Sequence, residues 1–161
     1  MFTQLEIHEL LRDQIGNSLE ISDYRNDSVV ISESTFCKGQ KGLIAIDNIP
    51  KHSIIFSFKN TVTYTRTRTS IQVSAETHIE PFEFGVCTNH SCLPNCFMYT
   101  HIRDNGATGH IVLISTEDIA KGTEITFDYA STEIELTPEL SGTQCQCRQF
   151  GCRRIMKGYA D

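Results

Sequence analysis

Short segments rich in β-branched and aromatic residues recur along the chain after residue 27, and they predict a mainly β protein. Such residues are enriched in strands, and turn-forming residues separate the segments here. The expected strands are residues 28–32, 43–46, 53–58, 70–74, 97–102, 110–115 and 124–127. The sequence RDNGATG at 103–109 contains Asn-Gly, which indicates a hairpin between the fifth and the sixth of these strands.

Helical spacing of hydrophobic residues is found only at the N-terminus, where Phe2, Leu5, Leu10 and Leu11 predict a short amphipathic helix over residues 2–14. The sequences NIPKHSII (48–55) and DIAKGTEI (118–125) share an isoleucine, a lysine, a hydroxyl residue and a second isoleucine at the same spacing. Two copies do not make a solenoid, so we interpret them as similar strand–turn–strand units.

The composition indicates an ordinary soluble protein of one domain. The 161 residues are 39% hydrophobic and 21% charged, and they contain no apolar run long enough to span a bilayer. The N-terminus lacks the basic region of a signal peptide, so we expect an intracellular location, in the cytoplasm or the nucleus, and no membrane partner. The net charge of −6 argues against direct binding of nucleic acid.

The cysteines point to metal binding rather than to disulfides, because their count of seven is odd and no signal peptide precedes them. Cys145, Cys147 and Cys152 form a C-x-C-x4-C run, which can supply three of the four thiolates of a tetrahedral zinc site. A structural zinc needs one further ligand. The candidates are Cys37, Cys87, Cys92 and Cys96.

The sequence TNHSCLPNC (88–96) concentrates reactive groups and has no hydrophobic period. A nucleophile paired with a base, a metal site and a capped turn are all compatible with its composition. Residues this close in sequence seldom face each other for proton transfer, which disfavours a Cys–His nucleophile at His90. Asparagine and serine near Pro94 favour a turn that their side chains stabilise.

Three motifs together carry a family resemblance. NHSCLPNC (89–96), GTEITFDY (122–129) and CQCRQFGC (145–152) follow one another as in SET-domain methyltransferases with a C-terminal post-SET zinc segment, which the chain resembles over about residues 37–155. The resemblance implies a mainly β fold of small curved, β-clip-like sheets with few short helices and a knot-like C-terminal threading. It also implies a division into an N-terminal extension (1–35), a SET domain (36–138) and a post-SET zinc segment with the C-terminal tail (139–161).

The resemblance further implies S-adenosylmethionine as cofactor and a set of site residues. Asn89 and His90 would hold its adenine end, Tyr129 would orient the acceptor amine, and Phe127 would limit how many methyl groups fit. The residues expected to bind the cofactor are Lys41, Gly42, Leu43, Asn89 and His90. One structural Zn²⁺ would be bound by Cys92, Cys145, Cys147 and Cys152, which leaves Cys96 for packing.

The chain departs from the family pattern at three places. Gln40 stands where the first glycine of the usual Gly-x-Gly loop would align, and Gly42 fits the second. Ser57 and Phe58 stand where the family often carries a channel tyrosine. The 28 residues between Asn60 and Asn89 are fewer than histone-directed members generally have.

The leading functional hypothesis is an N-methyltransferase that acts on a lysine of a protein. Free lysine has a pKa of ~10.4, and a dry channel beside a sulfonium would favour the neutral amine, so that no acid–base pair is required. One alternative is an enzyme that uses the same cofactor on a small-molecule amine or for other chemistry. The other is a catalytically silent SET-like binding module, against which the presence of Asn89, His90 and Tyr129 argues. The oligomeric state is not predicted.

Overall fold

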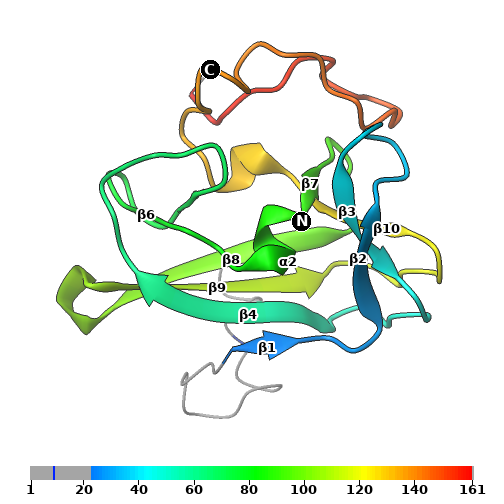
Figure 1. The fold of residues 1–161 in the computed structure, drawn as a ribbon, viewed down its shortest axis with the longest axis horizontal. Coiled ribbons are helices and arrows are strands. Elements are labelled where there is room, and N and C mark those ends of the chain that lie inside the picture. Colours follow the sequence, from blue (N-terminus) through cyan, green and yellow to red (C-terminus); the bar gives the residue numbers. More distant parts are fainter. Residues whose placement is uncertain (1–8, 10–22, 161) are drawn as a thin grey trace.

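The computed structural model describes residue 9 and residues 23–160 (Figure 1). The expected helix at 2–14 therefore lies, except for Glu9, outside the described residues. The helices after residue 22 are short: α2 (Glu83–Val86) and the 3₁₀ turns η1 (Asp104–Gly106) and η2 (Tyr129–Ser131). The fold is mainly β with small sheets, as the sequence predicts. No helix in the described part of the chain is long and apolar enough to cross a membrane.

Two four-stranded sheets and a two-stranded ribbon make up the described fold (Figure 1). The first sheet has the order β1 (Tyr24–Arg25), β4 (Ile54–Thr61), β9 (Thr108–Ser115) and β8 (Cys96–Arg103). The second has the order β2 (Val29–Glu33), β3 (Lys41–Ala45), β10 (Glu124–Phe127) and β7 (Asn89–His90). The ribbon pairs β5 (Ile71–Gln72) with β6 (His78–Ile79).

The hairpin expected around Asn-Gly joins β8 and β9. The two strands pair antiparallel over their full length, and η1 closes the turn between them. Asn105 has a φ of 53°, in the left-handed region that asparagine tolerates better than most residues. The prediction of this hairpin is confirmed, and its physical basis is local turn chemistry.

A parallel pairing of β7 with β10 brings two of the sequence motifs together. Asn89 lies opposite Thr126, and His90 lies opposite Phe127. Parallel neighbours need a long crossover connection, and here the β8–β9 hairpin lies within it. Residues almost forty positions apart therefore end side by side.

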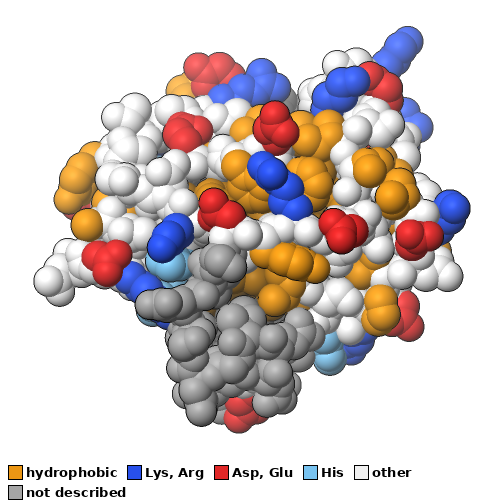
Figure 2. Space-filling view, turned by 60° about the horizontal axis from the view of Figure 1, so that its bottom comes forward, with side chains coloured by type: hydrophobic (Ala, Val, Ile, Leu, Met, Phe, Trp, Pro, Cys, Tyr) orange, Lys and Arg blue, Asp and Glu red, His pale blue; other side chains and the backbone are white. Residues whose placement is uncertain are grey.

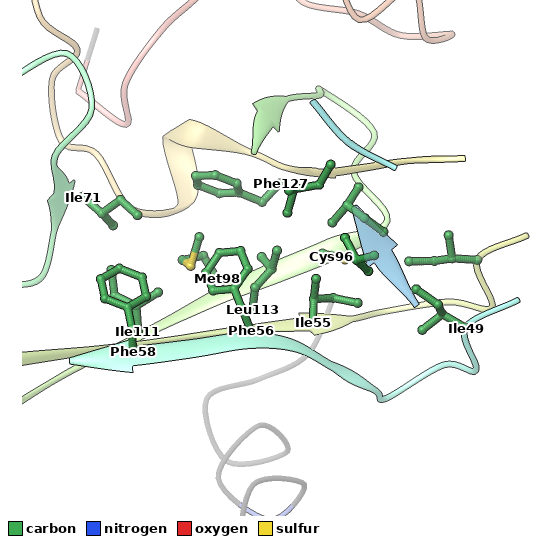
Figure 3. Packing of buried hydrophobic residues seen from close by; sticks show 14 of the residues in the cluster. Ile49, Ile55, Phe56, Phe58, Ile71, Cys96, Met98, Ile111, Leu113 and Phe127 are labelled. Carbon is green, nitrogen blue, oxygen red and sulfur yellow. The ribbon is translucent and has the colours of Figure 1, made fainter. Parts of the chain in front are cut away.

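The main core lies between the first and the second sheet (Figure 3). Phe56, Met98 and Leu113 project from the first sheet toward Phe127 of the second, and all four are almost fully buried. Because burial of such side chains is the dominant stabilising contribution to folding, this core holds the two sheets in a defined relation. Phe127 lies at its upper limit in Figure 3, where the core meets the irregular C-terminal part of the chain.

The two repeated segments found in the sequence bind each other. The backbone N–H of Lys51 donates to Oδ1 of Asp118 (2.8 Å), and the N–H of Lys121 donates to Oδ1 of Asn48 (3.0 Å). Each turn is thus capped by a side chain of the other, which explains why both carry the same chemistry.

The surface shown in Figure 2 carries charges of both signs. Acidic and basic side chains alternate there with polar and hydrophobic ones, and no continuous basic patch covers the described part of this face.

Candidate functional site

A cavity of about 400 Å³ lies where the second sheet, the β5–β6 ribbon and the C-terminal residues meet. Its lining includes Gln40, Asn89, His90, Phe127, Tyr129 and Glu133. The parallel β7–β10 pairing supplies three of these six residues, Asn89, His90 and Phe127, and Tyr129 follows two residues after the end of β10. Its volume is within the range of small-molecule sites, about 300–1,000 Å³.

The side chain of Asn89 is hydrogen-bonded to the first residues of strands β3 and β10. Its Nδ2 donates to the carbonyl oxygen of Lys41 and to Oε1 of Glu124, both at 2.8 Å. The other oxygen of Glu124 accepts from the backbone N–H and the hydroxyl of Thr35, at 2.6 and 2.8 Å. Glu124 therefore joins three separate segments at one buried carboxylate. No motif argument identifies this role, and the only signal is a charged residue inside the apolar strand EITF.

None of the three cofactor residues expected in β3 is among the described residues that line the cavity, although the Lys41 carbonyl accepts a hydrogen bond from Asn89, which does line it. Leu43 is fully buried in the hydrophobic core, and the side chain of Lys41 forms an exposed ion pair with Glu33. Gly42 packs so closely that an added Cβ would lie 2.3 Å from Oε1 of Glu124. The side chains of Cys37 and Gln40 line the cavity next to them.

The replacement Gly42→Ala is expected to destabilise the protein by about 1–3 kcal/mol, because the new methyl group must displace the Glu124 carboxylate from its buried hydrogen bonds. Denaturant unfolding measures this change. The neighbouring Lys41→Ala removes only an exposed ion pair and should change stability by less than about 1 kcal/mol. Equal stability of the two variants would contradict the expected close packing at Gly42.

His90 is a neutral imidazole with a defined tautomer. The backbone N–H of Tyr129 donates to Nδ1 at 3.2 Å, so the proton lies on Nε2, which faces the Cys92 sulfur at 3.3 Å. Burial lowers the pKa of His90 to about 4 even though the Asp128 carboxylate lies 3.5 Å from Nδ1. Asp128 is also paired with Arg153 at 2.5 Å, which ties the C-terminal residues to η2.

Tyr129 and Phe127 lie side by side at the cavity, with ring centroids 4.9 Å apart. The Tyr129 hydroxyl donates to the carbonyl oxygen of Thr88 at 3.0 Å. Burial raises the pKa of Tyr129, so its phenol stays neutral and remains a hydrogen-bond donor and acceptor. Phe58, by contrast, packs in the core against Phe82, and it is not among the described residues that line the cavity.

Four thiols meet beside His90. The sulfur atoms of Cys92, Cys145, Cys147 and Cys152 all lie within 4.8 Å of one another. Cys92 lies 3.8 Å from Cys145 and 4.0 Å from Cys152, close to the ~3.8 Å edge of a tetrahedron with ~2.3 Å zinc–sulfur bonds. These four residues could hold one tetrahedral metal ion, and an all-thiolate set suits zinc. Cys96, in contrast, is buried in the main core.

The cavity also contains residues that the sequence motifs do not mark. They come from the segment between β4 and β5 and from the residues after η2, and include Arg66, Thr69 and Glu133. The first segment has threonine at every second position from 61 to 69, which does not mark a known site, and the second has no distinctive pattern. Their place depends on how the β5–β6 ribbon folds against η2.

Known proteins resemble this chain in sequence and in fold. The family model "SET domain" matches residues 40–130, which is 91 of the 161 residues. An H3 lysine-9 specific histone-lysine N-methyltransferase of Fusarium mangiferae is 33% identical over 95 residues, covering 54% of this chain and 26% of the relative. Histone-lysine N-methyltransferase 2D of Homo sapiens is 34% identical over 68 residues, covering 42% of this chain and 1% of the relative.

Among solved structures, KRYPTONITE in complex with mCHH DNA, H3(1–15) peptide and SAH has a similar fold, with a TM-score of 0.63 and 20% identity. The similarity covers 82% of this chain and 30% of that one. The chain thus spans about a quarter, or much less, of the length of the two curated relatives. The sequence motifs, the parallel pairing that brings two of them together and the family model agree, and the chain belongs to the SET-domain family.

Proposed function

We propose that this chain is an S-adenosylmethionine-dependent methyltransferase that modifies a lysine side chain of a protein. The observation that carries the proposal is the β7–β10 pairing, which sets Asn89 and His90 beside Phe127 and Tyr129 at one cavity. Two relatives are named histone-lysine N-methyltransferases, and the KRYPTONITE complex contains SAH and an H3 peptide.

The cavity fits such a cofactor in size and in chemistry. Polar groups from Gln40, Asn89 and His90 surround one part of it, and the rings of Phe127 and Tyr129 form another. When bound, S-adenosylmethionine supplies a methyl group on a positively charged sulfur, and the bond from the acceptor nitrogen to the methyl carbon forms as the carbon–sulfur bond breaks, with the electron pair staying on sulfur. Positive charge thereby passes to the nitrogen.

The residues of the chain would contribute to the reaction mainly by positioning the acceptor amine. The Tyr129 hydroxyl and the Thr88 carbonyl lie 3.0 Å apart, and both can accept a hydrogen from an amine whose lone pair then points along the line of transfer. The partly dry surroundings disfavour the ammonium form, so the acceptor can lose its proton to solvent before transfer. Such positioning needs no acid–base pair.

The four-cysteine cluster would hold one structural zinc ion, and residues 139–161 would be the post-SET segment that follows the SET domain at 36–138. All seven cysteines are free thiols in the structure, which suits a reducing compartment, the cytoplasm or the nucleus. The role of the extension at 1–35 is not part of the proposal.

Methyl-labelled S-adenosylmethionine tests the function directly. The purified chain is incubated with H3(1–15) peptide, with cell-lysate proteins and with free lysine, and the products are identified by mass spectrometry. Label on a protein or peptide lysine supports the proposal. Label confined to small molecules would favour the small-amine alternative, and calorimetric cofactor binding without any transfer would favour a binding module.

Phe127→Tyr is expected to shift the products toward the monomethyl species. The added hydroxyl and a water bound to it would occupy room beside the acceptor nitrogen, where the phenyl ring of Phe127 leaves space. Mass spectrometry of the reaction products measures the shift. Phe150→Tyr, at a position that is 99% exposed, is the matched control and should leave the product distribution unchanged. A wild-type product that never passes one methyl group contradicts this prediction.

A further inference from the structure

A buried carboxylate lines the cavity without belonging to any of the sequence motifs. Glu133 is 8% exposed, and its Oε1 accepts from the backbone N–H of Gln72 at 2.8 Å and from the Thr132 hydroxyl at 3.2 Å. The side chain of Gln72 accepts in turn from the N–H of Ile134 at 2.9 Å. Gln72 of β5 therefore binds the Glu133 carboxylate and the backbone of the next residue, Ile134, which fixes the position of this segment.

The negative charge of Glu133 has no bonded cation in the described structure. The nearest basic group is Nδ1 of His78, 3.9 Å from Oε2 and beyond hydrogen-bond distance. Burial lowers the pKa of His78, so its imidazole is neutral at pH 7. The Arg66 guanidinium forms its own ion pair with Glu135 at 3.5 Å, and at longer range it partly offsets the burial that raises the pKa of the Glu133 carboxyl. Buried charges are normally paired, so a carboxylate in this state would gain from a cation that enters the cavity.

Glu133 lies four residues after Tyr129 and lines the same cavity, from the segment that follows η2. Its backbone N–H donates to the Tyr129 carbonyl at 2.9 Å, and its side chain is bound to the β5–β6 ribbon. Asn89 and Gly42 lie in the second sheet. Figure 1 shows η2, which begins at Tyr129, between that ribbon and strands β7 and β3. If Asn89 and His90 hold the cofactor, we expect the acceptor to enter from the ribbon side of η2, where Glu133 is bound.

We propose that Glu133 supplies a fixed negative charge beside the acceptor nitrogen. This inference rests on the proposed function and assigns to Glu133 the recognition of the lysine acceptor as a cation. The carboxylate attracts the ammonium form into the cavity and by itself raises the pKa of the amine, whereas desolvation and the positive sulfur of a bound cofactor lower that pKa and allow the proton to leave. After the proton has left to solvent, the same carboxylate stabilises the positive charge that arrives on nitrogen during transfer, as a preorganised charge does in a desolvated site.

Calorimetry with two cofactor analogues tests this role without any turnover. S-adenosylhomocysteine carries no charge at the transfer position, whereas sinefungin carries an ammonium group there, and both share the same adenosine and amino-acid ends. Glu133→Gln keeps an oxygen for the Gln72 N–H and removes the charge. We expect this variant to weaken sinefungin binding by about tenfold and S-adenosylhomocysteine binding by less than about twofold.

Glu135→Gln is the matched control, because it removes the same charge two residues away, from a side chain that points to solvent and pairs with Arg66. It should change neither affinity. In the wild-type chain the ¹³C NMR signal of the Glu133 carboxyl should shift with sinefungin and not with S-adenosylhomocysteine. This readout stays decisive if Glu133→Gln fails to fold.

Three results would overturn the inference. Equal weakening of both analogues would assign Glu133 to the amino-acid end of the cofactor. Unchanged affinities, or a carboxyl signal that responds to neither analogue, would leave Glu133 a purely structural role. A wild-type chain that binds neither analogue would instead overturn the proposed function, and the inference with it, which distinguishes the two failures.

Discussion

Tyr129→Phe should lower turnover by ~10²-fold or more while the affinity for S-adenosylmethionine barely changes. The substitution removes a single hydroxyl, which donates to the Thr88 carbonyl at 3.0 Å and lies beside the Phe127 ring. Without this hydroxyl the Thr88 carbonyl alone would orient the acceptor. The lone pair of the acceptor nitrogen would then point along the line of transfer less often. Cofactor affinity would be kept, because the polar groups of Asn89 and His90 remain.

Steady-state kinetics with a lysine peptide and calorimetry with the cofactor measure the two effects separately. Tyr64→Phe is the control, because Tyr64 is 79% exposed and the loss of its hydroxyl should leave turnover unchanged. If Tyr129→Phe turns over at the wild-type rate, Tyr129 has no part in orienting the acceptor. If cofactor affinity falls together with turnover, the hydroxyl contributes to the cofactor site instead.

Removal of zinc should abolish activity and weaken cofactor binding without unfolding the domain. The cysteine cluster belongs to a small second core formed by Leu136, Cys145, Cys147 and Met156, separate from the main core between the sheets. Zinc typically contributes ~10–16 kcal/mol of apparent binding free energy in small peptides. Its loss should therefore release the residues after η2 from the cavity, while the main core keeps the sheets folded.

A strong chelator and Cys92→Ser should have the same effect, with a far-UV circular dichroism spectrum that stays close to that of the untreated protein. Elemental analysis should find one zinc per chain, and Cys145→Ser should lose it. Cys96→Ser, four residues from Cys92, should keep its zinc because Cys96 is packed in the main core. Loss of zinc from Cys96→Ser with retention in Cys92→Ser would contradict the assignment of ligands, and full activity without zinc would contradict the role of the metal.

Part of the site depends on contacts that local sequence does not encode. Glu124 and Glu133 are two of twenty acidic residues. Glu124 is marked only by its place in the apolar strand EITF, and nothing in the neighbours of Glu133 distinguishes it from a solvated residue. Glu124 is buried by Asn89 and Thr35, and Glu133 by Gln72, across separations of 35, 89 and 61 positions. Such roles become visible only when the chain is folded.

The local sequence also carries little information about the shortest strands. Residues 78–79 and 89–90 form only two-residue strands, too short for an alternating pattern to emerge. The expected strand at 70–74 is present but is only two residues long, at Ile71–Gln72. TNHSCLPNC reads as a turn in sequence, yet its Asn89 and His90 form the edge strand β7 because β10 lies beside them. That pairing is also what unites the two motifs.

The sequence by itself determined the mainly β class, the longer strands, the Asn-Gly hairpin and the three thiols of C-x-C-x4-C. Each of these features depends on residue types that lie within a few positions of one another, so the local sequence is enough to predict it. Cys37, Cys87, Cys92 and Cys96 are equivalent as thiols, and in the sequence only the family resemblance pointed to Cys92. The tertiary structure decided the matter physically, because long-range packing brings Cys92, and none of the other three, to the C-x-C-x4-C thiols. In the folded chain the parallel β7–β10 pair and the hydrogen bond from the Tyr129 N–H to His90 bring Cys92 to the other three.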